Sequence, residues 1–261
     1  MKIEIVIPAY NEEKRIGKTL ERYSELFDRL SKENLIEYEI LVVINNTKDK
    51  TRDIVEKHKA RNKKINYLDL KKKGKGYAIK EGFIEALKRK SELIGFVDAD
   101  LSTSPEAFYD LVRGAEGYDG AIADRYIEGA IVSPKQSFVR IFVSRVFNFL
   151  IKVLFLMKYK DTQCGAKVFT RKAVEKIICY MTMTQWAFDI DLLYSCRKKG
   201  LRIKPVPTRW KDVEGSKLNV IRTSIQMFLA VIQLRILRSR FRGMLKVMGP
   251  IVGIIYKLVR R

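Results

Sequence analysis

The stretch Leu93-Ile94-Gly95-Phe96-Val97-Asp98-Ala99-Asp100 places two carboxylates, one residue apart, at the end of an apolar run. The apolar run predicts a buried strand, and Ser102-Thr103-Ser104-Pro105 predicts the end of that strand. Open α/β sheets bind ligands at the carboxyl ends of their strands, so we expect Asp98 and Asp100 to line a binding cleft. Side chains at i and i+2 of extended chain point the same way. Both carboxylates are therefore expected to contact one hard cation, Mg²⁺ or Mn²⁺.

A second interpretation of the same stretch is a helix N-terminus. Asp, Ser and Thr residues before Pro105-Glu106 are also ordinary helix caps. The two interpretations differ in what the carboxylates contact, a cation or the backbone amides of a helix.

The composition allows one large α/β domain with an appendage, because 261 residues with 47% hydrophobic content form a sizeable core. The formal net charge of +22 indicates anionic partners, which include nucleic acid, anionic lipid headgroups and phosphorylated substrates. Cys164, Cys179 and Cys196 have no paired spacing, which indicates neither a zinc site nor a disulfide framework and favours a reducing, cytoplasmic setting.

Strand and helix patterns alternate in the first part of the chain. This alternation predicts a mostly parallel sheet with helices on both faces, an α/β fold. The helical spacing is clearest at 12–28 and 77–90. The apolar runs that predict strands lie at 3–8, 39–44, 65–70 and 93–97, and further strands are expected at 120–126 and, at a sheet edge, at 201–207.

Polar, charged and turn-forming residues gather where the predicted strands end, so they are expected to converge along one edge of the sheet. Such an edge suits a nucleoside diphosphate, with backbone amides and a lysine at the phosphates, side chains at the base and ribose, and a cation between the phosphates. The residues expected to bind this ligand are Pro8, Tyr10, Glu12, Asn45, Asn46, Lys75 and Asp98.

Three of these motifs together resemble family 2 glycosyltransferases, which have a nucleotide-sugar-binding fold of the GT-A type. The motifs are Ile5-Val6-Ile7-Pro8-Ala9-Tyr10-Asn11-Glu12, the basic Gly74-Lys75-Gly76 and Asp98-Ala99-Asp100. The family usually carries an Asp pair where this chain has Asn45-Asn46, which leaves the identity of the base open.

The second half of the chain is similar to dolichyl-phosphate β-glucosyltransferases. The similar segments are Asp161-Thr162-Gln163-Cys164-Gly165-Ala166-Lys167, Trp186-Ala187-Phe188-Asp189-Ile190-Asp191 and Gly215-Ser216-Lys217-Leu218. Related dolichyl-phosphate mannose synthases share the Asp-x-Asp, the Arg125-Tyr126 segment and Ser-Lys-Leu. The resemblance implies an inverting transfer of a hexose onto dolichyl or polyprenyl phosphate at the cytoplasmic face of a membrane, with UDP-glucose as donor or, alternatively, GDP-mannose.

The resemblance also implies roles for individual residues. Asp98 and Asp100 would hold the metal against the donor diphosphate, and Asp100, Asp189 and Arg125 would act in catalysis. The acceptor phosphate is already largely ionised at neutral pH. No dedicated base is required, and Asp189 is expected either to act as base or to order the site. The cations expected at the acceptor phosphate are Arg125, Arg140, Arg145 and Lys217.

An apolar segment at 138–157 is interrupted by polar residues that form one stripe on a helix. A helix that spans a bilayer would place two arginines at depth, at about 2.5–3.5 kcal/mol for each Arg near the centre. We therefore expect an interfacial helix, with a buried core helix as the alternative. Arg140 and Arg145 are then expected to face inward, toward a lipid phosphate.

The residues at 218–261 combine apolar helical patterns with a cluster of arginines and lysines. We expect a catalytic domain at 1–217 and, at 218–261, amphipathic basic helices that bind an anionic membrane surface. An oligomer interface is the alternative use of the same apolar faces. A protein that binds nucleic acid is disfavoured, because no recognised motif is present and the Asp-x-Asp would have no explanation.

Overall fold

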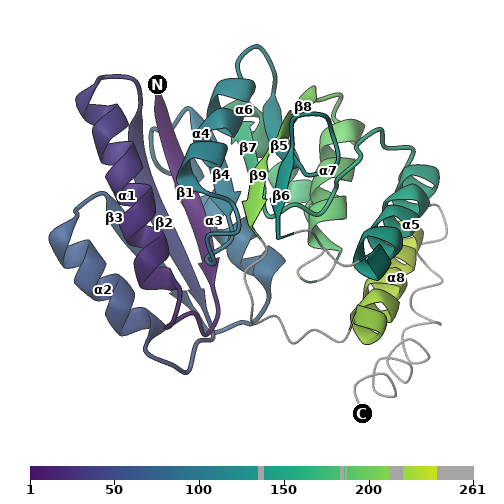
Figure 1. Ribbon diagram of the computed structural model, residues 1–261, viewed down its shortest axis with the longest axis horizontal. Coiled ribbons are helices and arrows are strands. Elements are labelled where there is room, and N and C mark those ends of the chain that lie inside the picture. The colour runs from purple at the N-terminus through teal and green to yellow at the C-terminus, as the bar shows by residue number, and fades with distance from the viewer. Residues whose placement is uncertain (135–137, 183–184, 186, 212–219, 240–261) are drawn as a thin grey trace.

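The computed structural model in Figure 1 describes residues 1–134, 138–182, 185, 187–211 and 220–239. At 138–140, 142–143 and 220–225 the description is limited to the backbone. Lys217, Trp186 and the segment 240–261 lie outside the described residues, so the expectations that rest on them stay predictions. None of the described helices is both long enough and apolar enough to cross a bilayer.

Strands and helices alternate in the first half of the chain, as the sequence predicts. The elements are β1 (Lys2–Ala9), α1 (Ile16–Lys32), β2 (Glu37–Asn45), α2 (Thr51–Arg61), β3 (Ile65–Leu70), α3 (Lys75–Leu87), β4 (Leu93–Val97), α4 (Pro105–Gly114) and β5 (Gly120–Asp124).

The second half is less regular and contains two short strands that the sequence patterns do not predict, β6 and β9. The elements are β6 (Ile131–Ser133), α5 (Phe138–Phe155), β7 (Ala166–Thr170), α6 (Arg171–Ile177), a 3₁₀ turn (Ile178–Tyr180), α7 (Phe188–Lys198), β8 (Ile203–Pro207), β9 (Arg209–Lys211) and α8 (Val220–Leu237).

The main sheet has seven strands in the order β3-β2-β1-β4-β7-β5-β8. All neighbouring pairs are parallel except those of β7, which runs antiparallel to β4 and β5. The strand order reverses beside β1, whose two neighbours are β2 and β4. Ligands bind at such a switch point in open α/β sheets. The predicted mostly parallel sheet is confirmed, and so is the edge position of β8.

Helices cover both faces of the sheet, because strands such as β2 are apolar on both sides. One face packs against α1, α2 and α4, where Tyr23, Phe27 and Phe108 lie together as aromatic contacts. The other face packs against α3, α6 and α7. The molecule is therefore a three-layer sandwich, and the carboxyl ends of the parallel strands form the edge at which the sequence predicts ligand binding.

Helices α5 and α8 lie side by side at one end of the molecule (Figure 1). On α5, Asn148 is buried toward the sheet domain, whereas four large apolar side chains along the opposite face and just past the helix end are more than half exposed. These are Val146, Phe149, Val153 and Leu156, which we call the α5 apolar face. An outward apolar face opposite the buried Asn148 agrees with the expected interfacial helix, which stays a prediction.

Helix α8 also contributes to the core formed with the sheet and α7. Its Ala230, Val231 and Leu234 are buried in the same cluster as α7. Just beyond the helix, Arg238 pairs with the buried Asp191, so it does not belong to a free basic cluster as the sequence suggested. The boundary expected at residue 217 stays a prediction, but α8 is packed onto the domain that precedes it.

Candidate active site

A cleft of about 330 Å³ opens where β1, β2 and β4 end. Six of the seven residues expected to bind the donor line it together with Asp100, and only Asn46 is absent from its wall. The complete lining is Pro8, Tyr10, Glu12, Asn45, Lys73, Gly74, Lys75, Asp98, Ala99 and Asp100. The predicted convergence of strand ends therefore forms one cavity.

The two carboxylates of the Asp-x-Asp lie in a turn rather than on the strand, because β4 ends at Val97. The argument that extended chain aligns their side chains is thus wrong, but the turn brings both into the cleft. One oxygen of Asp100, Oδ1, accepts from the Ser102 amide at 2.9 Å. The expected helix N-terminus is confirmed, because α4 begins at Pro105, but its cap is Ser104, which accepts from the Ala107 amide, and neither aspartate caps it.

Lys75 lies at the first position of α3, and its Nζ is 2.5 Å from Oδ1 of Asp98. Burial disfavours the charged lysine, but Asp98, Asp189 and Asp100 outweigh this effect and raise the pKa of Lys75. Burial likewise raises the pKa of the Asp98 carboxyl, against the effect of Lys75. Gly74 precedes the helix with φ of 141°, a conformation that favours glycine. The helix N-terminus and its ammonium therefore both face the cleft.

Asn45 and Asn46 have different environments although they are adjacent. Asn45 is 3% exposed, and its side-chain Oδ1 has no hydrogen-bond partner among the described residues. A buried amide oxygen that lines a cleft is a ready acceptor for a ligand donor, because leaving it unpaired is unfavourable. Asn46 is exposed and adopts a left-handed conformation with φ of 55°.

The segment that follows β1 forms the opposite wall of the cleft. Glu12 forms an ion pair with Arg15, with 2.7 Å between Oε2 and Nε. Burial raises the pKa of the Glu12 carboxyl, against the effect of Arg15. Tyr10 is 37% exposed and lies under the Lys73 ammonium, which is 4.3 Å from the ring centroid. This wall therefore presents an aromatic ring and a cation at the cleft mouth.

Asp189 approaches the cleft from α7. Gly76 permits this approach, since a Cβ there would lie 2.6 Å from Phe188. Asp189 Oδ1 accepts from Lys167 Nζ at 2.6 Å. Its neighbour Asp191 is fully buried and binds Thr182 and Arg238, so its role is in the fold. Asp189 is the carboxylate that the sequence placed in the site, and it is close enough to act electrostatically on Lys75 and Asp98.

A second glycine fixes the position of Asp98. A Cβ on Gly165 would lie 1.9 Å from Oδ2 of Asp98, far inside contact distance. The carbonyl of Gly165 also accepts from the Asp98 amide at 3.2 Å. The absence of a side chain at Gly165 is therefore required for the carboxylate to occupy the cleft.

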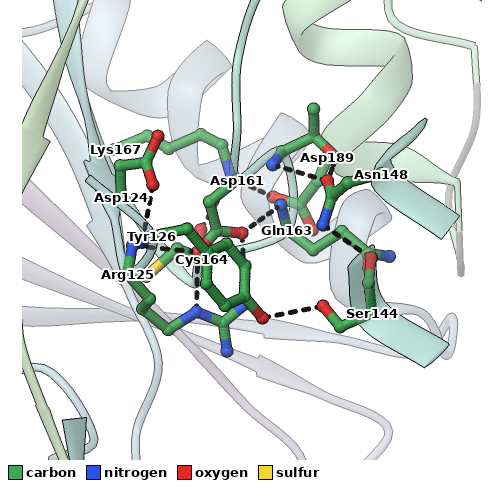
Figure 2. A network of polar contacts seen from close by, with 11 residues as sticks. Asp124, Arg125, Tyr126, Ser144, Asn148, Asp161, Gln163, Cys164, Lys167 and Asp189 are labelled. Atoms are coloured by element: carbon green, nitrogen blue, oxygen red, sulfur yellow. Dashed lines mark hydrogen bonds and ion pairs between the residues drawn. The ribbon is translucent and has the colours of Figure 1, made fainter. Parts of the chain in front are cut away.

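Arg125 follows β5 and forms an ion pair with the fully buried Asp161. Its Nε and Nη2 lie 2.6 and 3.1 Å from the two carboxylate oxygens (Figure 2). The guanidinium also packs against Tyr126 and Trp210, 5.5 and 5.2 Å from the ring centroids. Arg125 therefore has a structural role, because it neutralises a buried carboxylate. A role at the acceptor phosphate stays a prediction.

Helix α5 is joined to this region by hydrogen bonds (Figure 2). The hydroxyls of Tyr126 and Ser144 are 2.7 Å apart. The Asn148 side-chain oxygen accepts from the amide and the hydroxyl of Thr162, at 3.3 and 3.1 Å. These contacts attach α5 beside Arg125, so the end of the molecule that carries the α5 apolar face lies next to Arg125.

The other cations expected at the acceptor phosphate are not brought together in the described structure. Arg145 is exposed on α5, so the expectation that it faces inward is wrong. For Arg140 only the backbone in α5 is described, and Lys217 lies outside the described residues. Their role at a phosphate stays a prediction.

The residues of the cleft fit a divalent cation that the substrate helps to hold. The described residues contain no group of three or more acidic, histidine or cysteine side chains that forms a complete cation site. Asp98 and Asp100 instead offer a pair of carboxylates that line an open cleft. Mg²⁺ is commonly held by one or two carboxylates together with substrate phosphates. The donor set therefore fits a metal that binds with a diphosphate.

Three important residues were not singled out from the sequence: Lys167, Asp161 and Trp210. Asp161 and Lys167 are the first and last residues of the segment 161–167, which resembles dolichyl-phosphate β-glucosyltransferases. For Lys167 the available signal was a charged residue within an apolar strand. Trp210 is on the unpredicted strand β9, where Thr103 pairs with it across an isolated bridge. No local pattern connects Trp210 to Arg125.

The chain matches known protein families over most of its length. The profile of Glycosyl transferase family 2 matches residues 4–178. A dolichyl-phosphate beta-glucosyltransferase of Dictyostelium discoideum is 31% identical over 244 residues, which cover 89% of this chain and 73% of that protein. The protein of the same name from Homo sapiens is 32% identical over 254 residues, covering 92% and 77%.

Solved structures with the same fold include glucosyl-3-phosphoglycerate synthase from Mycobacterium tuberculosis. Its complex with UDP superposes with a TM-score of 0.66 at 17% identity, covering 90% of this chain and 80% of that one. Its complex with Mn²⁺, UDP and glucosyl-3-phosphoglycerate gives a TM-score of 0.65 at 18% identity, covering 90% and 79%. At this level of identity the likeness shows a shared fold.

Proposed function

This chain belongs to glycosyl transferase family 2, and we propose that it transfers glucose from UDP-glucose to dolichyl or another polyprenyl phosphate with inversion at the anomeric carbon. Family membership confirms the resemblance that the motifs predict. Relatives whose names include this activity match 89% and 87% of this chain, which supports the acceptor and the sugar. The observation that carries the proposal is the cleft that joins Asn45, Lys75, Asp98 and Asp100.

The cleft supports a nucleotide sugar as donor. The N-terminus of α3 and the Lys75 ammonium supply positive charge for a diphosphate. The unpaired buried Oδ1 of Asn45 offers an acceptor to a base or ribose donor. UDP is the nucleotide bound in solved complexes of a protein with the same fold, which agrees with a uridine donor.

Asp98 and Asp100 are the residues that would hold Mg²⁺ or Mn²⁺. Such an ion, when bound, would neutralise charge that develops on the leaving nucleoside diphosphate. Mn²⁺ accompanies UDP in a solved protein of the same fold. Lys75, which contacts Asp98, would contribute a second positive charge beside the diphosphate, and this charge comes from the protein rather than from a bound ion.

The acceptor phosphate needs cations rather than a strong base, because it is largely ionised at neutral pH. Arg125 is the described cation beside the attachment of α5, and its guanidinium is held by Asp161 and Trp210. With the guanidinium fixed, an incoming phosphate meets an ordered donor rather than a mobile one. Asp189, which is close enough to act electrostatically on Lys75 and Asp98, would accept hydrogen bonds from hydroxyls of the donor sugar.

The α5 apolar face supports work at a membrane surface, where a polyprenyl acceptor resides. Its four apolar side chains are exposed, and Arg145 is exposed on the same helix. Apolar side chains that enter a headgroup region together with nearby cations are favourable at an anionic surface. We propose peripheral or monotopic attachment at the cytoplasmic face of the membrane.

The test is a transfer assay with purified full-length protein, a short-chain polyprenyl phosphate in detergent, Mn²⁺ and separate nucleotide sugars. We expect a glucosyl product from UDP-glucose, with the β-linkage visible by NMR, and none from the Asp100→Asn variant. GDP-mannose is the comparison donor. Transfer from GDP-mannose without transfer from UDP-glucose would reject the proposed sugar and favour a mannose synthase.

A further inference from the structure

One buried lysine behind the cleft holds a site carboxylate although it does not line the cavity. The side chain of Lys167, on β7, is 1% exposed. Its Nζ lies 2.6 Å from Oδ1 of Asp189 and 2.7 Å from the carbonyl oxygen of Cys164. It also lies over the ring of Phe96, 5.3 Å from the centroid. A buried ammonium is strongly unfavourable without partners, so these contacts fix its position.

Both ends of this ion pair stand on rigid elements. Lys167 is the antiparallel partner of Phe96 on β4, the strand that leads to Asp98. Asp189 is in the first turn of α7, whose Phe188 packs against Gly76. The ion pair therefore joins the sheet to α7 close to the turn that carries Asp98 and Asp100.

The charges at the site divide into two pairs. Lys75 contacts Asp98, and Lys167 contacts Asp189. Asp189 is nevertheless close enough to act electrostatically on both Lys75 and Asp98. Since Lys75 already interacts electrostatically with Asp189, loss of Lys167 would draw Lys75 toward Asp189 and away from the place where a diphosphate binds.

We propose that Lys167 is a positioning residue: it holds the Asp189 carboxylate toward the sugar of the donor and leaves Lys75 available for the diphosphate. This inference rests on the proposed function and names how the sugar is recognised. Asp189 Oδ1 is bound by Lys167, while Oδ2 has no hydrogen bond among the described residues and the side chain is 14% exposed. A carboxylate fixed at one oxygen presents the other as an acceptor for sugar hydroxyls.

The test compares the binding of UDP with that of UDP-glucose, each with Mn²⁺, to full-length protein by calorimetry. The ratio of the two affinities isolates the sugar contact. We expect Asp189→Asn and Lys167→Met each to reduce the preference for UDP-glucose by about tenfold, since a hydrogen bond to a charged group is lost. Lys167→Arg should retain the ratio within about threefold, because it keeps the charge.

The double variant distinguishes positioning from general damage. If Lys167 acts only through Asp189, adding Lys167→Met to Asp189→Asn should leave the ratio unchanged. This comparison holds even where Lys167→Met alone does not fold, because the double variant contains no unpaired buried carboxylate. An additional loss in the double variant, an unchanged ratio in Lys167→Met, or equal losses for UDP and UDP-glucose would each overturn the proposal.

The same measurements separate this inference from the proposed function. An Asp189→Asn variant with the wild-type ratio would reject the sugar contact, and with it the role of Lys167, while glucosyl transfer by wild-type protein would still support the function. If the variants change the affinity ratio as predicted but the wild-type protein transfers no glucose to polyprenyl phosphate, the proposed function alone is rejected.

Discussion

The Lys75 ammonium lies 2.5 Å from Oδ1 of Asp98, so the cation expected at the donor diphosphate and a carboxylate expected at the metal are direct partners. A bound metal ion and Lys75 would compete for the Asp98 carboxylate, whereas a diphosphate would bind both cations. Metal and nucleotide binding should therefore be coupled through this pair.

The coupling predicts opposite effects of Lys75→Met on two ligands. Affinity for Mn²⁺ alone should rise several-fold, because the ammonium no longer competes for Asp98, and affinity for UDP should fall about tenfold or more. Electron paramagnetic resonance of free Mn²⁺ measures the first effect and calorimetry the second. Lys73→Met is the matched control, since Lys73 also lines the cleft but lies over Tyr10. Weaker Mn²⁺ binding in Lys75→Met would contradict the competition.

The two carboxylates should differ in what their loss does. Asp100→Asn should abolish transfer with the melting temperature unchanged, because a cleft carboxylate is lost and Asp100 forms no ion pair with the described residues. Asp98→Asn should weaken donor binding and the response to added Mn²⁺, and it also removes the partner of Lys75. Turnover with a range of Mn²⁺ concentrations measures both effects. Normal turnover of both variants with a chelator present would rule out the metal site.

Arg145 provides a test of the acceptor cations that does not disturb the fold. Because Arg145 is exposed, Arg145→Ala should change the free energy of unfolding by no more than about 0.5 kcal/mol. If it contacts the lipid phosphate, the apparent KM for a short-chain polyprenyl phosphate should rise while that for the nucleotide sugar stays constant. Arg125→Ala is unsuited to this test, since it leaves Asp161 buried and unpaired, a change that costs about 3–5 kcal/mol. Unchanged acceptor kinetics would remove Arg145 from the site.

The α5 apolar face predicts where the protein meets a membrane. Phe149→Asp should reduce binding to anionic vesicles by at least about tenfold, since burial of a large apolar side chain contributes about 1.5–3 kcal/mol. Phe149 is 68% exposed, so the fold should not change. Leu35→Asp is the matched control, because Leu35 is 51% exposed in the turn between α1 and β2. Equal flotation of both variants with the vesicles would contradict this surface.

A buried carboxyl away from the cleft predicts a dependence of stability on pH. Burial raises the pKa of Glu4 from 4.5 to about 7, against the effect of Arg89. Between these values the folded state binds more protons than the unfolded state, so stability falls as the pH rises from about 4.5 to about 7. Glu4→Gln should remove up to about 3 kcal/mol of this fall. Melting temperatures across this range measure it, and the exposed Glu33→Gln should change nothing. An equally steep fall in Glu4→Gln would contradict the assignment.

Local patterns in the sequence predicted the strands of the parallel sheet and the residues that gather at its edge. Apolar runs of strand length and turn residues after them depend only on near neighbours along the chain, so β1 to β4 could be recognised from them. Parallel strands place their carboxyl ends together, which is why Pro8, Asn45 and Asp98 could be expected in one cleft before any contact was known.

Only the tertiary structure decided which charges are partners. The pairs Lys75–Asp98, Lys167–Asp189 and Arg125–Asp161 join residues that are far apart in the chain, and their geometry depends on how α3, α7 and β7 pack. The sequence could not show that the Asp98 carboxylate packs against Gly165, where no side chain fits. Packing of whole elements fixes these contacts, because a side chain's partner depends on the path of the backbone around it and not on its neighbours along the chain.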